Sequence, residues 1–285
     1  MTVATKISEV RQQIKDWKRN GLTVGLVPTM GYLHEGHASL IKTSVEHCDK
    51  TVVSVFLNPT QFAPNEDLES YPRDFDNDKK LCEEMGADLV FHPEVSEMYD
   101  EDNSTFVEIL SDMPKQLCGK TRPIHFRGVC TVVSKLFNIV TPDKAFFGEK
   151  DAQQLAIIRK MVKDMSYGIE IIGCPIVRES DGLAKSSRNT YLSDEERKAA
   201  LCLSKAVNLG KEIIANGEKN AETVLSKMKE LINAEPLAKI DYVEAVDGVT
   251  MNPVKEIKEN TLVAMAVYIA VSYTHLRAHE TRSNL

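Results

Sequence analysis

Two histidines three residues apart, His34 and His37, are the side chains in this sequence best suited to chemistry. They follow an apolar stretch at 22–27 and a turn at 28–31, where a helix is expected to begin. Residues three apart on a helix share a face, so both imidazoles would lie beside the partly positive helix N-terminus, where phosphate binds well. An isolated pair of this kind is more often two polar side chains at a helix end, and no third metal ligand lies nearby in the sequence.

Two further turns offer groups that a polyphosphate needs. Residues 185–188 read Lys-Ser-Ser-Arg, which combines a point charge, two hydroxyl donors and a forked guanidinium. Lys150 lies in the turn 148–151, after an expected strand and before an expected helix. Seen alone, each turn is equally compatible with a solvated loop. The histidine pair and the two turns therefore support one another only if the fold brings them together.

Two other stretches resemble known motifs but lack required residues, and a third motif is missing. Residues 118–121 resemble the end of a P-loop, but Pro114 stands where the first glycine belongs. The aspartates at 74, 76 and 78 have a calcium-loop spacing, but Lys79 replaces the required glycine and Met85 the closing glutamate. A G-x-G-x-x-G dinucleotide fingerprint is absent from the sequence.

The elements that must position these residues alternate in type. Helical spacing covers 4–20, 36–47 and 75–85, and short apolar strands are expected at 22–27, 51–57 and 88–92. Such alternation predicts a Rossmann-like parallel sheet with helices on both faces. Ligands of these sheets bind beyond the carboxyl ends of the strands, which is where the polar loops 28–37 and 58–62 lie.

The same alternation continues and then stops. After an irregular polar stretch at 94–124, a helix at 129–140, a strand at 144–147, a helix ending near 165 and a strand at 169–177 are expected. Beyond them the pattern predicts helices at 193–216 and 220–233 and strands at 240–246 and 262–269. We therefore predict an α/β domain at 1–176 and a small α+β domain at 177–285.

Composition limits the class of protein. With 35 Lys and Arg against 42 Asp and Glu, the net charge is -7, which argues against a nucleic-acid or acidic-membrane surface. The six cysteines have no paired spacing, the first residues lack an apolar signal core, and no apolar run suits a membrane span. A cytoplasmic protein without membrane or nucleic-acid partners is expected.

Five motifs, taken in order, resemble one family. They are Val27–His37, Val55–Phe62, Tyr71–Arg73, Phe147–Gln154 and Asp181–Asn189. Together they are similar to the pantothenate synthetase (pantoate–β-alanine ligase) family, within the H-x-G-H nucleotidyltransferase and class I aminoacyl-tRNA synthetase superfamily. The resemblance covers about residues 3–270.

The resemblance implies ATP-dependent condensation of (R)-pantoate and β-alanine to (R)-pantothenate, AMP and diphosphate through a pantoyl adenylate. It also implies a homodimer, and Mg²⁺ that accompanies ATP and is held largely by phosphates and water rather than by a protein site. Two alternatives stay open: another H-x-G-H adenylyltransferase, and a non-catalytic nucleotide-binding dimer.

Site residues are implied by matching the family motifs position by position. The implied catalytic residues are His34, His37, Lys150, Ser186, Ser187 and Arg188. The implied ATP-binding residues are Met30, Gly31, Tyr32, Leu33, His34, Glu35, Gly36, His37, Gly148, Glu149, Lys150, Asp151, Val177, Lys185, Ser186, Ser187 and Arg188. The implied pantoate-binding residues are Gln61, Gln154, Pro28, Thr29, Asn58, Tyr71 and Arg122.

Two features depart from the family pattern. Lys185 stands where many members carry an apolar residue such as Met, which leaves the phosphate role of the loop intact and adds a cation. Residues 271–285 lack apolar periodicity, and we expect them to be a non-native tail. Its two histidines, His275 and His279, have the spacing of a metal chelate, which we consider the weaker interpretation.

Overall fold

The computed structural model describes residues 1–64, 66–270 and 280–282, which pack as two compact units. The first unit takes residues 1–110, 122–148 and 157–174, and the second takes 111–121, 149–156 and the described part of 175–285. Each unit therefore contains discontinuous segments. The sequence-based boundary at 176/177 stays a prediction, and it lies close to the last passage of the chain between the units.

The first unit is built on a parallel six-stranded sheet in the order β1-β4-β3-β2-β5-β6. Its elements are β1 (Thr2–Ala4), α1 (Ile7–Arg19), β2 (Val24–Thr29), α2 (Glu35–His47), β3 (Lys50–Val55), a 3₁₀ turn (Pro59–Gln61), α3 (Phe75–Glu84), β4 (Leu89–Phe91), α4 (Val95–Met98), α6 (His125–Val140), β5 (Lys144–Gly148) and β6 (Glu170–Cys174). Helix α7 (Ala152–Asp164) begins in the second unit and ends in the first. The strand order reverses between β2 and β5, where such sheets bind their ligands.

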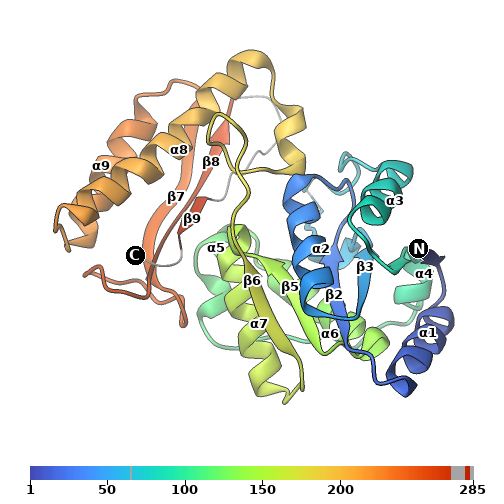
Figure 1. The fold of residues 1–285 in the computed structure, drawn as a ribbon. Helices are drawn as coiled ribbons and strands as arrows, with labels where there is room; N and C mark the ends of the chain where they lie inside the picture. The colour runs from blue at the N-terminus through green and yellow to red at the C-terminus, as the bar shows by residue number, and fades with distance from the viewer. Residues whose placement is uncertain (65, 271–279, 283–285) are drawn as a thin grey trace. The chain divides into compact units, whose positions relative to one another are not determined.

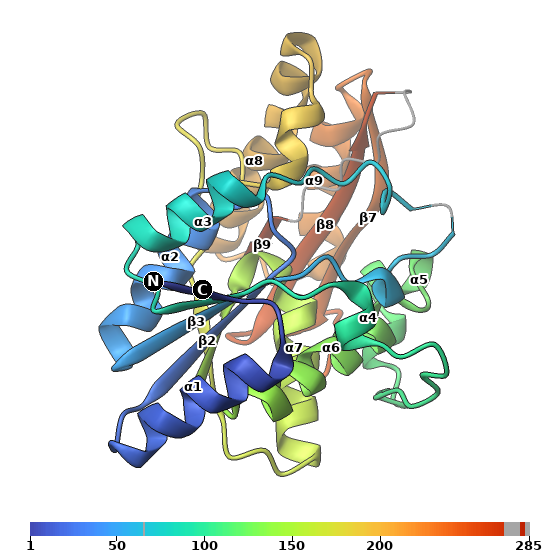
Figure 2. The same ribbon diagram turned by 90° about the vertical axis from the view of Figure 1, so that its right-hand side faces the viewer.

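Helices cover both faces of this sheet (Figures 1 and 2). Ile41 of helix α2 packs against the face of the sheet that Val27, Val53 and Phe146 form. It approaches β2 so closely that a Cβ on Gly25 would come within 2.2 Å of the α2 residue Ser44. Helices α1 and α6 contact each other and β2. The predicted fold class is confirmed.

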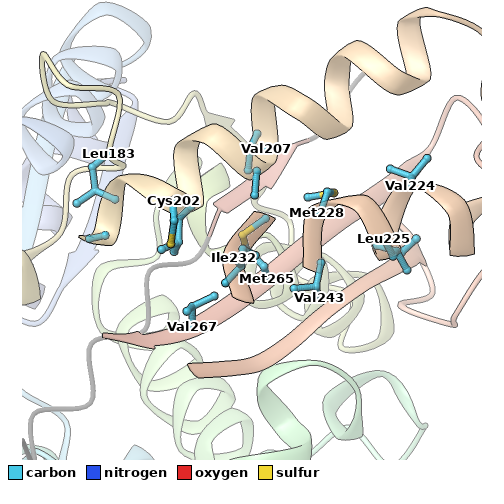
Figure 3. Packing of buried hydrophobic residues seen from close by; sticks show 14 of the residues in the cluster. Leu183, Cys202, Val207, Val224, Leu225, Met228, Ile232, Val243, Met265 and Val267 are labelled. Atoms are coloured by element: carbon cyan, nitrogen blue, oxygen red, sulfur yellow. The ribbon is translucent and has the colours of Figure 1, made fainter. Parts of the chain in front are cut away.

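The second unit is a small α+β body. It contains 3₁₀ turns at Met113–Lys115, Glu149–Asp151 and Ser187–Tyr191, helices α5 (Cys118–Thr121), α8 (Asp194–Ala215) and α9 (Ala221–Asn233), and strands β7 (Ala238–Asp247), β8 (Thr261–Ile269) and β9 (Glu280–Arg282). The strands are antiparallel in the order β7-β8-β9. Figure 3 shows its core, where α8 and α9 pack on β7 and β8 through residues such as Val207, Met228, Val243 and Met265.

The structure changes several expected boundaries. Strand β1 was not expected, because three residues are too few to show a period. Helix α6 begins at His125 rather than 129, and β6 ends at Cys174 rather than 177. The stretch 94–124 carries the short helices α4 and α5.

The end of the chain is described only in part. Residues 280–282 form β9, which pairs with β8, whereas His275 and His279 lie outside the described residues. The non-native origin of 271–285 stays a prediction. Within the described part of the chain, every helix is too short or too polar to cross a bilayer.

Candidate functional site

The turn after β2 is held by one buried carboxylate. Gly31 and Tyr32 both adopt positive φ, at 86° and 52°, which turns successive backbone N–H groups toward a single point. Asp78 of α3, only 1% exposed, lies at that point and accepts the N–H of Tyr32 at 2.9 Å and of Leu33 at 2.6 Å. Burial raises the pKa of Asp78, while these two hydrogen bonds and the nearby His92 oppose the rise. Helix α3 therefore fixes the path of the chain toward α2.

The two histidines at the start of α2 hold each other in one orientation. His34 caps the helix: its Nδ1 accepts the N–H of Gly36 at 3.1 Å, and its own N–H donates to Nδ1 of His37 at 3.2 Å. The ring centroids lie 4.1 Å apart. Because each Nδ1 accepts a backbone N–H, each neutral ring carries its proton on Nε2. Both half-buried imidazoles are thus prepared as hydrogen-bond donors beside a helix N-terminus.

The turn after β3 presents Gln61 next to this segment. Gln61 is 6% exposed, and its Nε2 donates to Sδ of Met30 at 2.8 Å. Asn58 is 1% exposed; it donates to Oε1 of Gln61 at 3.2 Å and to the carbonyl of Gly128 at 3.1 Å. The Oδ1 of Asn58 accepts the hydroxyl of Tyr99 at 2.9 Å. Asn58 consequently orients Gln61, and Gln61 and Met30 lie side by side.

Pro28 and Thr29 lie at the end of β2, beside the same residues. Pro28 is half-buried and pairs in register with Ser54, and Thr29 donates its hydroxyl to the Ser54 carbonyl at 2.7 Å. The amide of Gly31 donates back to that hydroxyl at 3.3 Å. The predicted pantoate residues of this strand therefore adjoin the predicted ATP residues of the turn.

Tyr71 and Arg122 are placed less simply. Tyr71 is 5% exposed and packs edge-on against Phe62, with ring centroids 6.4 Å apart. The guanidinium of Arg122 is forked onto Glu66, with Nε 2.8 Å from Oε2, and it also lies over the Phe62 ring. A substrate carboxylate at Arg122 would have to share it with Glu66.

Four supporting residues of the first unit were not identified from the sequence: Asp78, Tyr99, His125 and Gly128. Nδ1 of His125 lies 3.1 Å from the Gln61 carbonyl. A Cβ on Gly128 would come within 2.4 Å of the backbone after β3, so only glycine permits α6 to approach it. Asp78 had a visible signal, its place in the aspartate run, but that run was considered only as a calcium loop. The first aspartate of the run instead caps α3: Asp74 accepts the Asn77 N–H at 3.1 Å.

In the second unit, the turn Glu149–Asp151 leads into α7. The first turn of α7 carries two adjacent glutamines with different environments. Gln153 is 5% exposed and fully used: it accepts the Cys118 N–H and donates to the carbonyls of Met113 and Gln116. Gln154 is half-buried, and its side-chain amide makes no hydrogen bond to the described residues. Lys150 lies 3.7 Å from Asp151, in the turn that follows the end of β5.

The segment after Cys174 folds back on itself before α8. Val177 accepts the N–H of Lys185 at 2.9 Å, and Ser186 caps the 3₁₀ turn by accepting the N–H of Arg188 at 3.3 Å. Ser187 is 7% exposed, and Lys185 and Arg188 are half-buried. The loop therefore offers its cations and hydroxyls from one short, ordered turn.

Burial makes several of the cysteine thiols unreactive. All six cysteines are free, and burial raises the pKa of Cys82 and Cys130 to about 12 and that of Cys202 to about 11. Thiols of this kind are protonated at neutral pH. Among the described residues, His, Cys, Asp and Glu side chains form no group of three that could hold a metal ion.

Comparison with known proteins agrees with the motif resemblance. The family model for pantoate-beta-alanine ligase matches residues 2–278. Pantothenate synthetase from Ruminiclostridium cellulolyticum is 58% identical over 269 residues, which are 94% of this chain and 95% of that protein. The enzyme of that name from Clostridioides difficile is 59% identical over 264 residues, or 93% of each chain.

Solved structures agree in fold over nearly the whole chain. Pantothenate synthetase from Thermus thermophilus matches with a TM-score of 0.91 and 38% identity, covering 99% of both chains. Pantoate-beta-alanine ligase from Francisella tularensis, solved with beta-gamma ATP and beta-alanine, matches with a TM-score of 0.79 and 31% identity, covering 98% of this chain and 97% of that one. Since the family model and these relatives match this chain over nearly its whole length, the chain belongs to the pantoate–β-alanine ligase family.

Proposed function

We propose that this protein condenses (R)-pantoate with β-alanine at the expense of ATP, giving (R)-pantothenate, AMP and diphosphate. The observation that carries the proposal is the paired orientation of His34 and His37, whose Nδ1 atoms both accept backbone N–H groups at the start of α2. This arrangement places two imidazoles beside a helix N-terminus, where a phosphate chain binds well. Family membership assigns the reaction that such a site serves.

The reaction has two displacements. A carboxylate oxygen of pantoate bonds to the α-phosphorus of ATP as the bond to the β-phosphate oxygen breaks, which gives pantoyl adenylate and diphosphate. The amine of β-alanine then bonds to the acyl carbon, the bond to AMP breaks, and the amine loses a proton. Neither step requires a covalent protein nucleophile, in keeping with the protonated cysteines. The protein contributes positioning and charge stabilisation.

The roles of the residues follow from their chemistry and surroundings. His37, assisted by His34, would donate to phosphate oxygens, and Gly36 would allow the nucleotide to approach closely. Gly36 also leaves room for the His34 ring, which a Cβ at this position would meet at 2.8 Å. Lys150, Ser186, Ser187 and Arg188 would hold the β- and γ-phosphates while charge moves onto the leaving diphosphate. The remaining nucleotide contacts would come from residues 30–35, 148–151, 177 and 185.

Pantoate would be bound chiefly by Gln61 and Gln154, because an amide serves a hydroxyl and a carboxylate equally well. Support for Gln61 is its fixed position beside Met30, and support for Gln154 is that its amide makes no bond to the described residues. Pro28, Thr29 and Asn58 are further candidates for pantoate binding. Tyr71 and Arg122 are weaker candidates because they are already packed against Phe62 and Glu66.

Mg²⁺ would enter with ATP, held by phosphate oxygens and water, and would neutralise charge on the phosphates. A homodimer and a cytoplasmic location are part of the same proposal. The homodimer is implied by the family resemblance, and the cytoplasmic location by the unpaired spacing of the six cysteines.

A coupled assay for AMP tests the proposal. Release of AMP should require pantoate, β-alanine and ATP together, whereas ATP and pantoate without β-alanine should support exchange of labelled diphosphate into ATP. A different H-x-G-H adenylyltransferase would instead release diphosphate with a phosphate ester as acceptor. A non-catalytic nucleotide-binding protein would bind ATP without any turnover.

A further inference from the structure

The segment that precedes the phosphate-binding turn is a short two-stranded loop, residues 178–184. Its ends are bridged by the isolated antiparallel pair Arg178 and Ala184. Glu179 donates its N–H to the Leu183 carbonyl at 2.8 Å and accepts the N–H of Gly182 at 2.9 Å through its own carbonyl. Gly182 has a φ of 90°, which a tight reversal of this kind requires. The backbone path into Lys185 is thus set within this loop.

Arg197, on the first turn of α8, joins this loop to the helix. Its Nη1 lies 3.0 Å from Oε1 of Glu179, and its Nε lies 3.0 Å from Oδ2 of Asp181. A second guanidinium nitrogen, Nη2, also contacts Oδ2 of Asp181, at 2.5 Å. One planar fork consequently fixes two carboxylates of the same loop, a geometry that a lysine cannot reproduce.

The other end of the phosphate-binding turn is tied to the same carboxylate. Nδ2 of Asn189 donates to Oε1 of Glu179 at 2.7 Å and to the carbonyl of Ala184 at 3.0 Å. Glu179 Oε1 therefore receives both Arg197 and Asn189. Through the Asn189 side chain, the residues immediately before and after 185–188 are both linked to Glu179.

The ionisation of the network agrees with this geometry. Burial alone would raise the pKa of Asp181 and lower that of Arg197. Hydrogen bonds from Arg197 and Leu183 reverse the first effect and lower the pKa of Asp181, while hydrogen bonds to Asp181 and Glu179 raise the pKa of Arg197. The charged forms are the stable ones at neutral pH.

We infer that Arg197 is a positioning residue for the first half-reaction: through Glu179 and Asp181 it holds Lys185, Ser186, Ser187 and Arg188 where they stabilise the departing diphosphate. The inference rests on the proposed function. The turn 185–188 contributes by directed charges and donors, so a displacement of its backbone reduces the stabilisation of the transition state more than it reduces binding. Arg197 itself need not touch the nucleotide.

Measuring the two half-reactions separately distinguishes a positioning role of Arg197 from a general effect on folding. Arg197→Met keeps the aliphatic stem and removes the fork. We expect diphosphate–ATP exchange, which reports adenylate formation, to fall between about 10- and 100-fold. Conversion of supplied pantoyl adenylate and β-alanine to pantothenate should stay within about twofold of the unsubstituted protein.

Lys198→Met is the matched control, because Lys198 is the next residue on α8, is exposed and carries the same charge change. Both its half-reactions should stay unchanged. Arg197→Lys should restore only part of the exchange rate, since one ammonium cannot hold both carboxylates. Combined with Arg188→Ala, Arg197→Met should add little further loss in exchange if it acts through the turn.

Equal loss of both half-reactions in Arg197→Met, or an unchanged exchange rate, would overturn the inference. If that variant does not fold, Glu179→Gln and Asp181→Asn take its place in the same two assays, and wild-type exchange in both again rejects it. The proposed function fails separately, when exchange by the unsubstituted protein does not depend on pantoate.

Discussion

The two loops assigned to the nucleotide, residues 30–37 and 185–188, are supported in opposite ways. The first depends on Asp78, a carboxylate that is 1% exposed and, among the described residues, accepts hydrogen bonds from the backbone N–H groups of Tyr32 and Leu33. The second depends on Arg197, Glu179 and Asp181, whose side chains are 23–31% exposed and pair with one another. A buried acceptor of this kind has no substitute, because water cannot reach the donors that it would leave behind. The partly exposed network can be repaired by water, so its loss should affect geometry more than stability.

The largest effects should come from the side chains proposed to bind the phosphates, such as His37 in the first loop and Lys150 in the separate turn Glu149–Asp151. We expect His37→Ala and Lys150→Ala each to lower kcat on the order of 10²-fold or more, because each removes one donor to the transition state. Steady-state AMP release measures this, and unchanged melting temperatures would show that folding is intact. Losses below about threefold in both variants would mean that the roles are wrongly assigned. Lys163→Ala, late in α7, is the control.

Asp78→Asn should reveal the dependence on a single buried acceptor. Asparagine keeps the shape but turns an NH₂ group toward either Tyr32 or Leu33, leaving one buried N–H unsatisfied. Loss of about 1–3 kcal/mol in the free energy of unfolding is expected, together with a raised KM for ATP. Urea denaturation and ATP titration measure the two effects. Asp76→Asn, at an exposed position earlier in α3, should change neither. A fully stable Asp78→Asn variant with normal KM would contradict this account of the turn.

The comparison of these loops also shows what sequence could predict. Alternating apolar runs predicted the parallel sheet, and the motif at 27–37 located the histidine turn. The supporting contacts could not be predicted in this way, because Asp78 lies 45 residues from Leu33 and meets it only through the sheet order. For the same reason, the run of aspartates could be rejected as a calcium loop but not explained. Gly128 of α6 meets Gln61, and Tyr99, which follows α4, meets Asn58; both contacts depend on tertiary packing against the turn that follows β3.

The adjacent glutamines of α7 allow a smaller and cleaner test. Gln154→Ala should raise the KM for pantoate about tenfold with little change in kcat, which is the signature of lost ground-state binding. Gln153→Ala should lower the melting temperature by a few degrees, since it removes hydrogen bonds to Cys118, Met113 and Gln116. If Gln154→Ala loses stability instead, its amide has a structural partner. Gln61→Ala should raise the KM for pantoate to a similar extent as Gln154→Ala.

The smallest effects should be opposite pH dependences in the two supports. The folded-state pKa of Asp78 is raised, chiefly by burial. The proton that Asp78 binds therefore stabilises the fold. This stabilisation is fully present below the unfolded pKa and is lost as pH rises through the folded pKa. The folded-state pKa of Asp181 is lowered, because the hydrogen bonds from Arg197 and Leu183 outweigh its burial. Its contribution is therefore present above the unfolded pKa of about 3.9 and is lost as pH falls through the folded value.

Urea unfolding at a series of pH values measures these two dependences. The difference in unfolding free energy between the unsubstituted protein and Asp78→Asn should shrink as pH rises above about 4, because only the unsubstituted protein must lose that proton. The difference from Asp181→Asn should instead shrink as pH falls below about 4, where protonation of Asp181 removes its attraction to Arg197. If both differences in unfolding free energy change with pH in the same direction, the pKa values of Asp78 and Asp181 are not shifted in opposite directions, and this prediction is wrong.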